Sequence, residues 1–168
     1  MRNVANTTVI SNFAAVGRLD LLQRIVKELH IPLEVYKEIK NGQAAGYTFY
    51  DDIEQFIMPF SSEGWLRLVT MDETELQLFA PLLSVLDHGE AACLAIAQNR
   101  GWGFLTDDRL ARRQARAWNL PLSGTMGLLL LAVQDKLVTL DEGNDLLRQM
   151  MVVARYRAPH TDLRLILS

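Results

Sequence analysis

The sequence predicts an α/β protein in which helices cover both faces of a parallel β-sheet. Short apolar segments of strand length alternate with longer segments whose apolar residues recur at helical spacing. Strands that alternate with helices in this way form parallel sheets buried on both faces. The chain of 168 residues is 49% hydrophobic and 22% charged, which is typical of a globular protein and excludes a disordered or fibrous one. One domain spanning residues 1–168 is therefore expected.

The first half of the chain opens with a short buried strand. The asparagine and two threonines after Val4-Ala5 indicate a bend into a helix that Gly17 ends, and apolar residues on one face indicate a second helix. Residues 44–59 have an ambiguous pattern that favours one amphipathic helix. In order, we expect a strand to about Asn6, helices over 8–16 and 20–29, a short strand at His30-Ile31, a proline-initiated helix ending at Asn41-Gly42, and a helix over 51–58.

The second half of the chain repeats this alternation. The segments "WLRLVT", "GFLT" and "LPLSG" predict strands, which gives a sheet of four to five strands in all. Asp87 and Glu90 stand at the spacing of a capping box and open a helix rich in small residues. In order, we expect a strand over 65–70, helices over 72–86 and 87–99, a strand over 103–106, a helix over 107–118, a strand over 120–124, a helix over 125–136, and a C-terminal helix and arginine-rich tail over about 141–168.

Composition and charge exclude several classes of protein. The net charge of −3 gives no reason for nonspecific nucleic-acid binding by the whole molecule, so such binding would need a local basic patch. No apolar segment approaches the roughly 20 residues of a membrane span, and the first residues lack a signal-peptide pattern, so we expect a cytoplasmic protein. The single cysteine, Cys93, excludes an intrachain disulfide and a cysteine-based metal site, and its apolar neighbours favour a buried thiol.

Acidic and amide side chains fall at strand or helix ends that face one crevice in such a sheet. They are Asn6, Glu38, Glu90, Asp107 and Asp108. Clustered carboxylates suit Mg²⁺ or Mn²⁺, which prefer oxygen ligands. Such ions hydrolyse phosphodiesters by activating a water and stabilising the leaving oxygen. No glycine-rich phosphate loop, of either the GxGxxG or the GxxxxGK[ST] type, competes for a catalytic role.

Most of these acids also have a local structural explanation. Glu90 completes the capping box with Asp87, and Asp107 and Asp108 lie in the first turn of a helix, where the helix dipole favours negative charge. Taken singly, capping explains these three better than catalysis does. Glu38 lies near the end of its helix, where the dipole disfavours an acid, so a functional role is as well supported as a structural one.

Basic and hydroxyl side chains add candidate contacts for nucleic acid. Four arginines at helical spacing form one stripe: Arg109, Arg112, Arg113 and Arg116. The stripe fits a phosphate track for RNA or a docking face for an acidic protein segment, and equally a solvated surface. Thr7 or Thr8 could bind phosphate or a metal-bound water, and either could equally cap the first helix. The tail segment Arg155-Tyr156-Arg157 interleaves an aromatic ring with bases, as single-strand binders do, but a dimer contact or disorder fits as well.

These motifs in this order resemble the PIN domain family, and within it a small prokaryotic branch of toxin-like proteins. The resemblance spans about residues 3–165 and rests on five segments: "VANTTVISNFAAVGRLDLL", "IPLEVYKEI", "LDHGEAACLAIA", "GFLTDDRLARRQA" and "LPLSGTMGLLLLA". The first resembles the family's opening D-[TS]-[SN]-x-L motif, and the fourth its T-x-D motif. Each segment alone is a weak signal, whereas the combination is specific.

The resemblance implies a three-layer α/β/α fold and Mg²⁺- or Mn²⁺-dependent cleavage of single-stranded RNA. It also implies a frequent homodimer and a cognate small antitoxin as partner. By position, Glu38, Glu90 and Asp108 would be metal-site carboxylates, and Asp107 either a fifth acid or a helix-start residue. Asp108 is preferred as the ligand because it fills the last place of T-x-D.

Asn6 departs from the family pattern, which has aspartate at this position. An amide keeps a carbonyl oxygen but removes one negative charge, so weaker metal binding and lower activity are expected. A naturally degenerate site, a variant made to silence a toxic enzyme, and an active site that tolerates the amide all fit this residue. Two hypotheses follow: a weakened ribonuclease of the toxin type, and a catalytically silent PIN fold that acts as a nucleic-acid- or protein-binding regulatory module.

Overall fold

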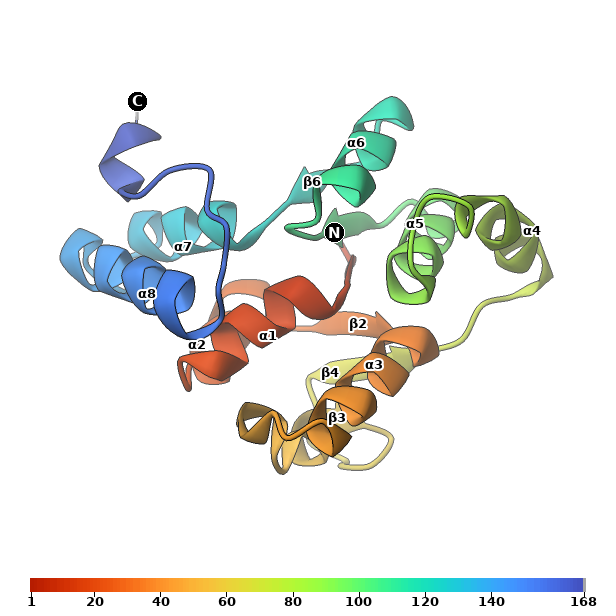
Figure 1. Ribbon diagram of the computed structural model, residues 1–168, viewed down its shortest axis with the longest axis horizontal. Coiled ribbons are helices and arrows are strands. Elements are labelled where there is room, and N and C mark those ends of the chain that lie inside the picture. Colours follow the sequence, from red (N-terminus) through yellow and green to blue (C-terminus); the bar gives the residue numbers. More distant parts are fainter. Residues whose placement is uncertain (168) are drawn as a thin grey trace.

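Six parallel strands form the central sheet of the computed structural model, which describes residues 1–167 (Figure 1). Their order along the sheet is β3-β4-β2-β1-β5-β6, and every neighbouring pair is parallel. The strands are β1 (Asn3–Ala5), β2 (Leu29–Pro32), β3 (Ile57–Met58), β4 (Leu66–Val69), β5 (Gly103–Leu105) and β6 (Leu122–Ser123). The predicted α/β class and parallel sheet are confirmed, but the predicted four to five strands are too few.

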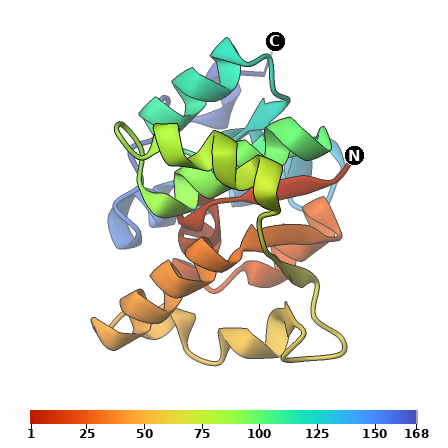
Figure 2. The ribbon, with the colours of Figure 1, turned by 90° about the vertical axis from the view of Figure 1, so that its right-hand side faces the viewer.

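Helices cover both faces of the sheet, as predicted. They are α1 (Thr7–Ala15), α2 (Leu19–Val26), α3 (Leu33–Ala44), α4 (Glu73–Leu82), α5 (His88–Arg100), α6 (Arg109–Ala117), α7 (Thr125–Gln134) and α8 (Leu140–Val153). In Figure 1, α1, α2, α7 and α8 lie together in the left half, whereas α4, α5 and α6 lie on the right. Helix α5 contacts β1, β2 and β5, and Figure 2 shows α4 and α5 in front of β1. This is the expected three-layer α/β/α arrangement.

Strand β3 forms where the sequence predicted a helix over residues 51–58, and that prediction is wrong. Ile53–Phe56 form a short 3₁₀ helix, and Ile57–Met58 pair with β4. Asp52 has a left-handed backbone, with φ 61°. A right-handed α-helix does not pass through this conformation, so the predicted helix cannot form at Asp52. Pro59 favours an extended backbone at the residue before it, Met58. The side chain of Ile57 is fully buried, and its burial stabilises the additional strand.

Helix α3 runs to Ala44, beyond its predicted end at Asn41-Gly42. A Cβ on Gly42 would lie 2.9 Å from Cε2 of Tyr50, so this glycine makes room for the tyrosine ring and does not end the helix. The left-handed glycine that follows the helix is Gly46, with φ 97°. A packing glycine and a terminating glycine look alike in the sequence, which is why the end was misplaced.

Two other helices end earlier than predicted. Helix α2 ends at Val26 and not at Leu29, because Lys27 has a left-handed backbone, with φ 65°, and Leu29 enters the buried strand β2. Helix α4 ends at Leu82, short of residue 86, and the next amides bond three residues back in tighter turns. Among the residues that the structure describes, none of the helices combines the length and apolar character needed to cross a bilayer.

The carboxyl ends of the three central strands meet at one edge of the sheet. Strand β1 lies between β2 and β5, with Val4 in register with His30 and Phe104. Helices α1, α3 and α6 begin within a few residues of the ends of β1, β2 and β5. Functional side chains of parallel α/β sheets gather outside such strand ends. This topology therefore places the candidate residues of α1, α3 and α6 at a common edge.

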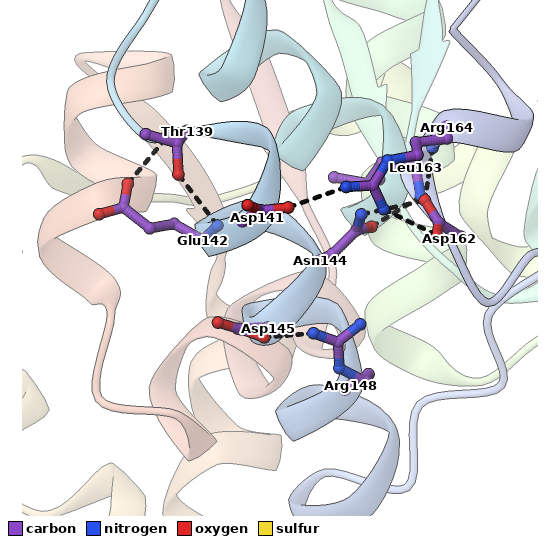
Figure 3. A network of polar contacts seen from close by, with 9 residues as sticks. All are labelled: Thr139, Asp141, Glu142, Asn144, Asp145, Arg148, Asp162, Leu163 and Arg164. Carbon is purple, nitrogen blue, oxygen red and sulfur yellow. Dashed lines mark hydrogen bonds and ion pairs between the residues drawn. The ribbon is translucent and has the colours of Figure 1, made fainter.

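The tail after α8 is held against that helix by a polar network (Figure 3). Asn144, only 1% exposed, donates from Nδ2 to Asp162 Oδ1 (3.0 Å) and accepts from Leu163 N (2.8 Å). Arg164 donates to Asp141 (2.8 Å) and to Asp162 (3.1 Å). Leu163 is fully buried and begins a short 3₁₀ helix (Leu163–Leu165). The network fixes the path of the tail.

We expect Asn144→Ala to lower the free energy of unfolding by about 2 kcal/mol, because the buried amide of Leu163 loses its acceptor. Urea denaturation measures this loss. The control is Asp145→Ala on the same helix, where Asp145 forms only an exposed pair with Arg148 and should change stability by less than about 0.5 kcal/mol. Equal losses in the two variants would show that the tail network does not stabilise the fold.

Candidate active site at the carboxyl edge of the sheet

Asn6 follows β1, is 2% exposed, and is the N-cap of α1. Its Oδ1 accepts hydrogen bonds from Thr8 N (3.3 Å) and from Thr8 Oγ1 (2.7 Å). The same Thr8 hydroxyl accepts from Asp107 N (3.0 Å), which links the ends of β1 and β5. Asparagine caps a helix about as well as aspartate does. The amide at this position therefore has a structural role that needs no negative charge.

Glu38 reaches from α3 to the starts of α1 and α5. Its Oε2 accepts from Thr7 Oγ1 (2.5 Å), and its Oε1 accepts from Gly89 N (3.0 Å). A Cβ on residue 89 would lie 2.6 Å from Oε1, so the missing side chain of Gly89 lets the carboxylate approach the backbone. Burial raises the pKa of Glu38, and the negative charge of Asp87 adds to this, against the lowering effect of both hydrogen bonds.

Glu90 completes the capping box predicted at the start of α5. Asp87 Oδ1 accepts from Glu90 N (2.8 Å), and Asp87 N donates to Glu90 Oε2 (3.2 Å). Burial, followed by the negative charges of Asp87, Asp108 and Glu38, raises the pKa of Glu90 from 4.5 to about 7. Carboxylates from α3, from the start of α5 and from the start of α6 therefore act on one another at this edge.

The adjacent residues Asp107 and Asp108 have different partners. Asp107 Oδ1 accepts from Thr125 N (2.8 Å), and its Oδ2 accepts from Thr125 Oγ1 (2.5 Å) and Asn12 Nδ2 (3.0 Å). Burial outweighs these bonds and raises the pKa of Asp107. Asp108 is the half-buried N-cap of α6, and its charge acts on Glu90. Asp107 thus joins α1 to α7, whereas Asp108 belongs to the acidic edge.

The hydroxyl and arginine candidates are partly committed to the fold. Thr7 and Thr8 both donate their hydroxyl hydrogens to protein acceptors, so each holds a neighbouring site residue in place. Arg112 Nη1 donates to the backbone oxygen of Thr106 (2.8 Å). The stripe predicted from helical spacing thus contains one anchored arginine and three exposed ones, Arg109, Arg113 and Arg116. A role for any of these residues in binding nucleic acid stays a prediction.

Glu34, which was not among the predicted site residues, lies one turn before Glu38 on α3. Its Oε2 is the one buried side-chain oxygen or nitrogen without a hydrogen-bond partner in residues 1–167. Burial, and then the charges of Glu38, Asp87, Glu34 and Glu90, raise the pKa of the buried Cys93 thiol. Glu34 and Glu38 are four residues apart, which places them on one face of the helix. This spacing was the sequence feature from which Glu34 could have been predicted.

The donor chemistry of this edge suits a hard divalent cation, because the candidates offer only carboxylate and amide oxygens. As the side chains lie, however, no group of three or more His, Cys, Asp or Glu within residues 1–167 is close enough to hold an ion. Asn6 Oδ1 already accepts two hydrogen bonds, and Glu90 and Asp108 cap helices. A metal would have to draw Glu38, Glu90 and Asp108 together from these bonds, and their role as ligands stays a prediction.

The free energy of unfolding of the unchanged chain should fall as the pH rises from about 4.5 to 7. We expect Glu90→Gln to remove this fall. In this window the unfolded state has released the Glu90 proton and the folded state retains it, so the free energy of unfolding falls as the pH rises. The full shift corresponds to about 3 kcal/mol, and solvent screening of this half-exposed group reduces it to about 1 kcal/mol. Thermal and urea unfolding at pH 5 and pH 8 measure the difference.

The control for this experiment is Glu142→Gln, which changes the same capping-box position on α8. Glutamine preserves the cap in both variants. If the two variants show the same pH dependence as the unchanged chain, the carboxylates at the edge do not repel one another.

We expect Asp107→Asn and Asp108→Asn to differ in stability. Asparagine at 107 places an amide nitrogen against the Asn12 amide, so buried donors lose their acceptor and unfolding should become easier by about 2 kcal/mol. Asparagine at 108 remains a good N-cap and should cost less than about 0.5 kcal/mol. Urea denaturation distinguishes these outcomes, and a larger loss at 108 would contradict the assignment of Asp107 to the fold.

Comparison with known families agrees with the fold. A family model described as a PIN domain matches residues 2–168. No match is found among the curated proteins. PIN domains are in general nucleases, which act on nucleic acid and usually use divalent metals such as Mg²⁺ or Mn²⁺. This chain belongs to the PIN domain family.

Proposed function

We propose that this chain is a metal-dependent endoribonuclease of the toxin–antitoxin type that cleaves single-stranded RNA, with activity weakened by Asn6. The observation that supports the proposal best is the raised pKa of Glu90, about 7, caused by burial and by the carboxylates of Asp87, Asp108 and Glu38. Acids gathered from three parts of the chain repel one another, and a divalent cation relieves that repulsion.

Glu38, Glu90 and Asp108 would hold the cation. When bound, Mg²⁺ or Mn²⁺ lowers the pKa of a water and neutralises charge on the phosphodiester. Thr7 and Gly89 orient the Glu38 carboxylate through their hydrogen bonds, which leave one lone-pair direction on each oxygen. Burial of this edge strengthens the electrostatic interaction of its carboxylates with any cation.

Asn6 is the reason that reduced activity is proposed. Its carbonyl oxygen carries no formal charge and already accepts hydrogen bonds from the amide and hydroxyl of Thr8. Metal affinity depends on the number of charged ligands, so the amide should weaken binding. A naturally degenerate site, a silenced variant and a tolerant active site all fit this geometry.

RNA phosphates would meet the exposed arginines of α6, which begins at Asp108. Arg109, Arg113 and Arg116 are exposed on that helix, whereas Arg112 is anchored to Thr106. Each contact between an arginine and a phosphate releases counterions, so binding should weaken as the salt concentration rises. A homodimer, a cognate small antitoxin and a cytoplasmic location remain predictions from the resemblance.

A catalytically silent binding module is the second candidate. It is favoured by the hydrogen bonds that already engage Asn6, Glu90 and Asp108 as helix caps. In that case the fold would keep its acids for local structure, and the arginines of α6 would carry the function.

Cleavage of a labelled single-stranded RNA in Mn²⁺ distinguishes the two candidates. Asn6→Asp restores a fourth charge and should raise both the cleavage rate and the Mn²⁺ affinity measured by calorimetry, by roughly tenfold. Adding Glu38→Gln to that variant should abolish the gain, while adding Glu142→Gln, an exposed residue on α8, should leave it intact. If neither the chain nor Asn6→Asp cuts RNA or binds Mn²⁺, the enzyme proposal fails.

A further inference from the structure

A cavity of about 1060 Å³ opens beside the acidic edge, between α6, β6, the start of α7 and the tail. Five arginines line it, against one acid, Asp107; they are Arg109, Arg112, Arg113, Arg116 and Arg157. The whole chain carries a net charge of −3, so this concentration of positive charge is local. A cavity lined in this way attracts an anionic partner.

The wall of the cavity includes the open edge of the sheet. Strand β6 is the outermost strand, and Leu122 and Ser123 both line the cavity. Pro121 O accepts from Phe104 N (2.8 Å) and Ser123 O accepts from Thr106 N (2.9 Å), so these groups face β5. Backbone groups alternate in direction along a parallel strand, and the N–H and C=O of Leu122 therefore face away from the sheet. An unpaired strand edge is a template for another extended chain.

Apolar side chains line the cavity between the arginines. Leu110 is 54% exposed on α6, and Leu122, Met126 and Pro159 also contribute to the lining. The one aromatic ring in the lining, Tyr156, is half-buried. Proteins that bind single strands stack successive bases on several aromatic rings, whereas this lining supplies one. The lining suits a peptide with alternating acidic and apolar side chains better than it suits RNA.

The tail forms a fixed wall of the cavity. Tyr156 N donates to Met150 O (3.1 Å) at one end of this segment. At the other end, Asp162 and Leu163 are bonded to the buried Asn144 of α8. Arg157 lies between these two anchors and faces the cavity opposite α6, and Figure 1 shows β6 between α6 and the chain that follows α8. A preformed wall lowers the entropic cost of binding a flexible segment.

We propose that this cavity binds an extended acidic segment of a partner protein, which adds as a seventh strand beside β6. The main chain of the segment would pair with the N–H and C=O of Leu122, and its carboxylates would pair with Arg109, Arg113, Arg116 and Arg157. The edge of β6 is short, so pairing fixes the orientation and the arginines supply most of the attraction. The segment would share its arginines with the RNA track proposed above and so compete with RNA, but its binding does not require the chain to cleave RNA.

Fluorescence anisotropy with three labelled probes tests this proposal, in EDTA so that no metal-dependent cleavage contributes. The probes are a peptide of alternating glutamate and valine, the matching lysine–valine peptide, and a single-stranded oligouridylate. We expect the glutamate–valine peptide to bind and the lysine–valine peptide not to bind. Arg113→Glu should weaken binding of the acidic peptide by about tenfold or more, whereas Arg24→Glu, an exposed arginine on α2 outside the cavity, should leave it unchanged.

Amide hydrogen exchange followed by NMR tests the strand addition itself. The amide of Leu122 should exchange rapidly in the free chain and become protected by the acidic peptide, while the amide of Phe104, already bonded to Pro121, should stay protected throughout. The proposal is overturned if the acidic peptide does not bind, if Arg113→Glu leaves its binding unchanged, or if Leu122 stays unprotected. It is also overturned if only the oligouridylate depends on Arg113, since the cavity would then be an RNA surface. None of these results bears on Mn²⁺-dependent cleavage, which is measured separately.

Discussion

The half-buried carboxylate of Asp107 is the constraint on which the edge of this fold depends. Burying a charge is costly unless hydrogen bonds replace its hydration, and Asp107 receives three, from the backbone and hydroxyl of Thr125 and from Asn12. Its own amide donates to Thr8, which also bonds Asn6. One residue thereby fixes α1, α7 and the ends of β1 and β5 relative to one another. These hydrogen bonds therefore help to position the acids at the strand ends and the arginines of α6.

Two regions of opposite charge meet at the turn between β5 and α6. Asp108 caps α6 and its charge acts on Glu90 at the start of α5, whereas the arginines of the same helix line the cavity beside β6. The acidic side suits a cation, and the basic side suits an anion. Under the proposed function, a phosphodiester that approached a metal at the acidic edge would meet this positive charge at the same time. Asp108 and Arg109 are neighbours in the chain, so the partner segment proposed for the arginines would also limit access to the acids.

Much of the fold was predictable because it depends on interactions between residues close in sequence. The capping box of Asp87 and Glu90 forms as predicted, since its hydrogen bonds join residues three apart. The strand β3 was missed because so short a segment is stabilised by its pairing with β4, by the burial of Ile57 and by the extended backbone before Pro59. The end of α3 was misplaced because Gly42 serves to accommodate Tyr50, which lies beyond the helix.

The sequence alone determined the alternation of strands and helices, the parallel sheet, and the presence of acids and arginines at the ends of elements. Periodicity and capping encode these features locally. Only the tertiary structure decided that Asp107 belongs to the fold and Asp108 to the acidic edge, although the two are neighbours of identical chemistry. Only it showed that Arg112 is anchored while Arg113 is exposed. The reason is physical: the partners of Asp107 come from segments about 20 to 100 residues away, and the bond of Arg112 to Thr106 depends on how α6 turns away from β5.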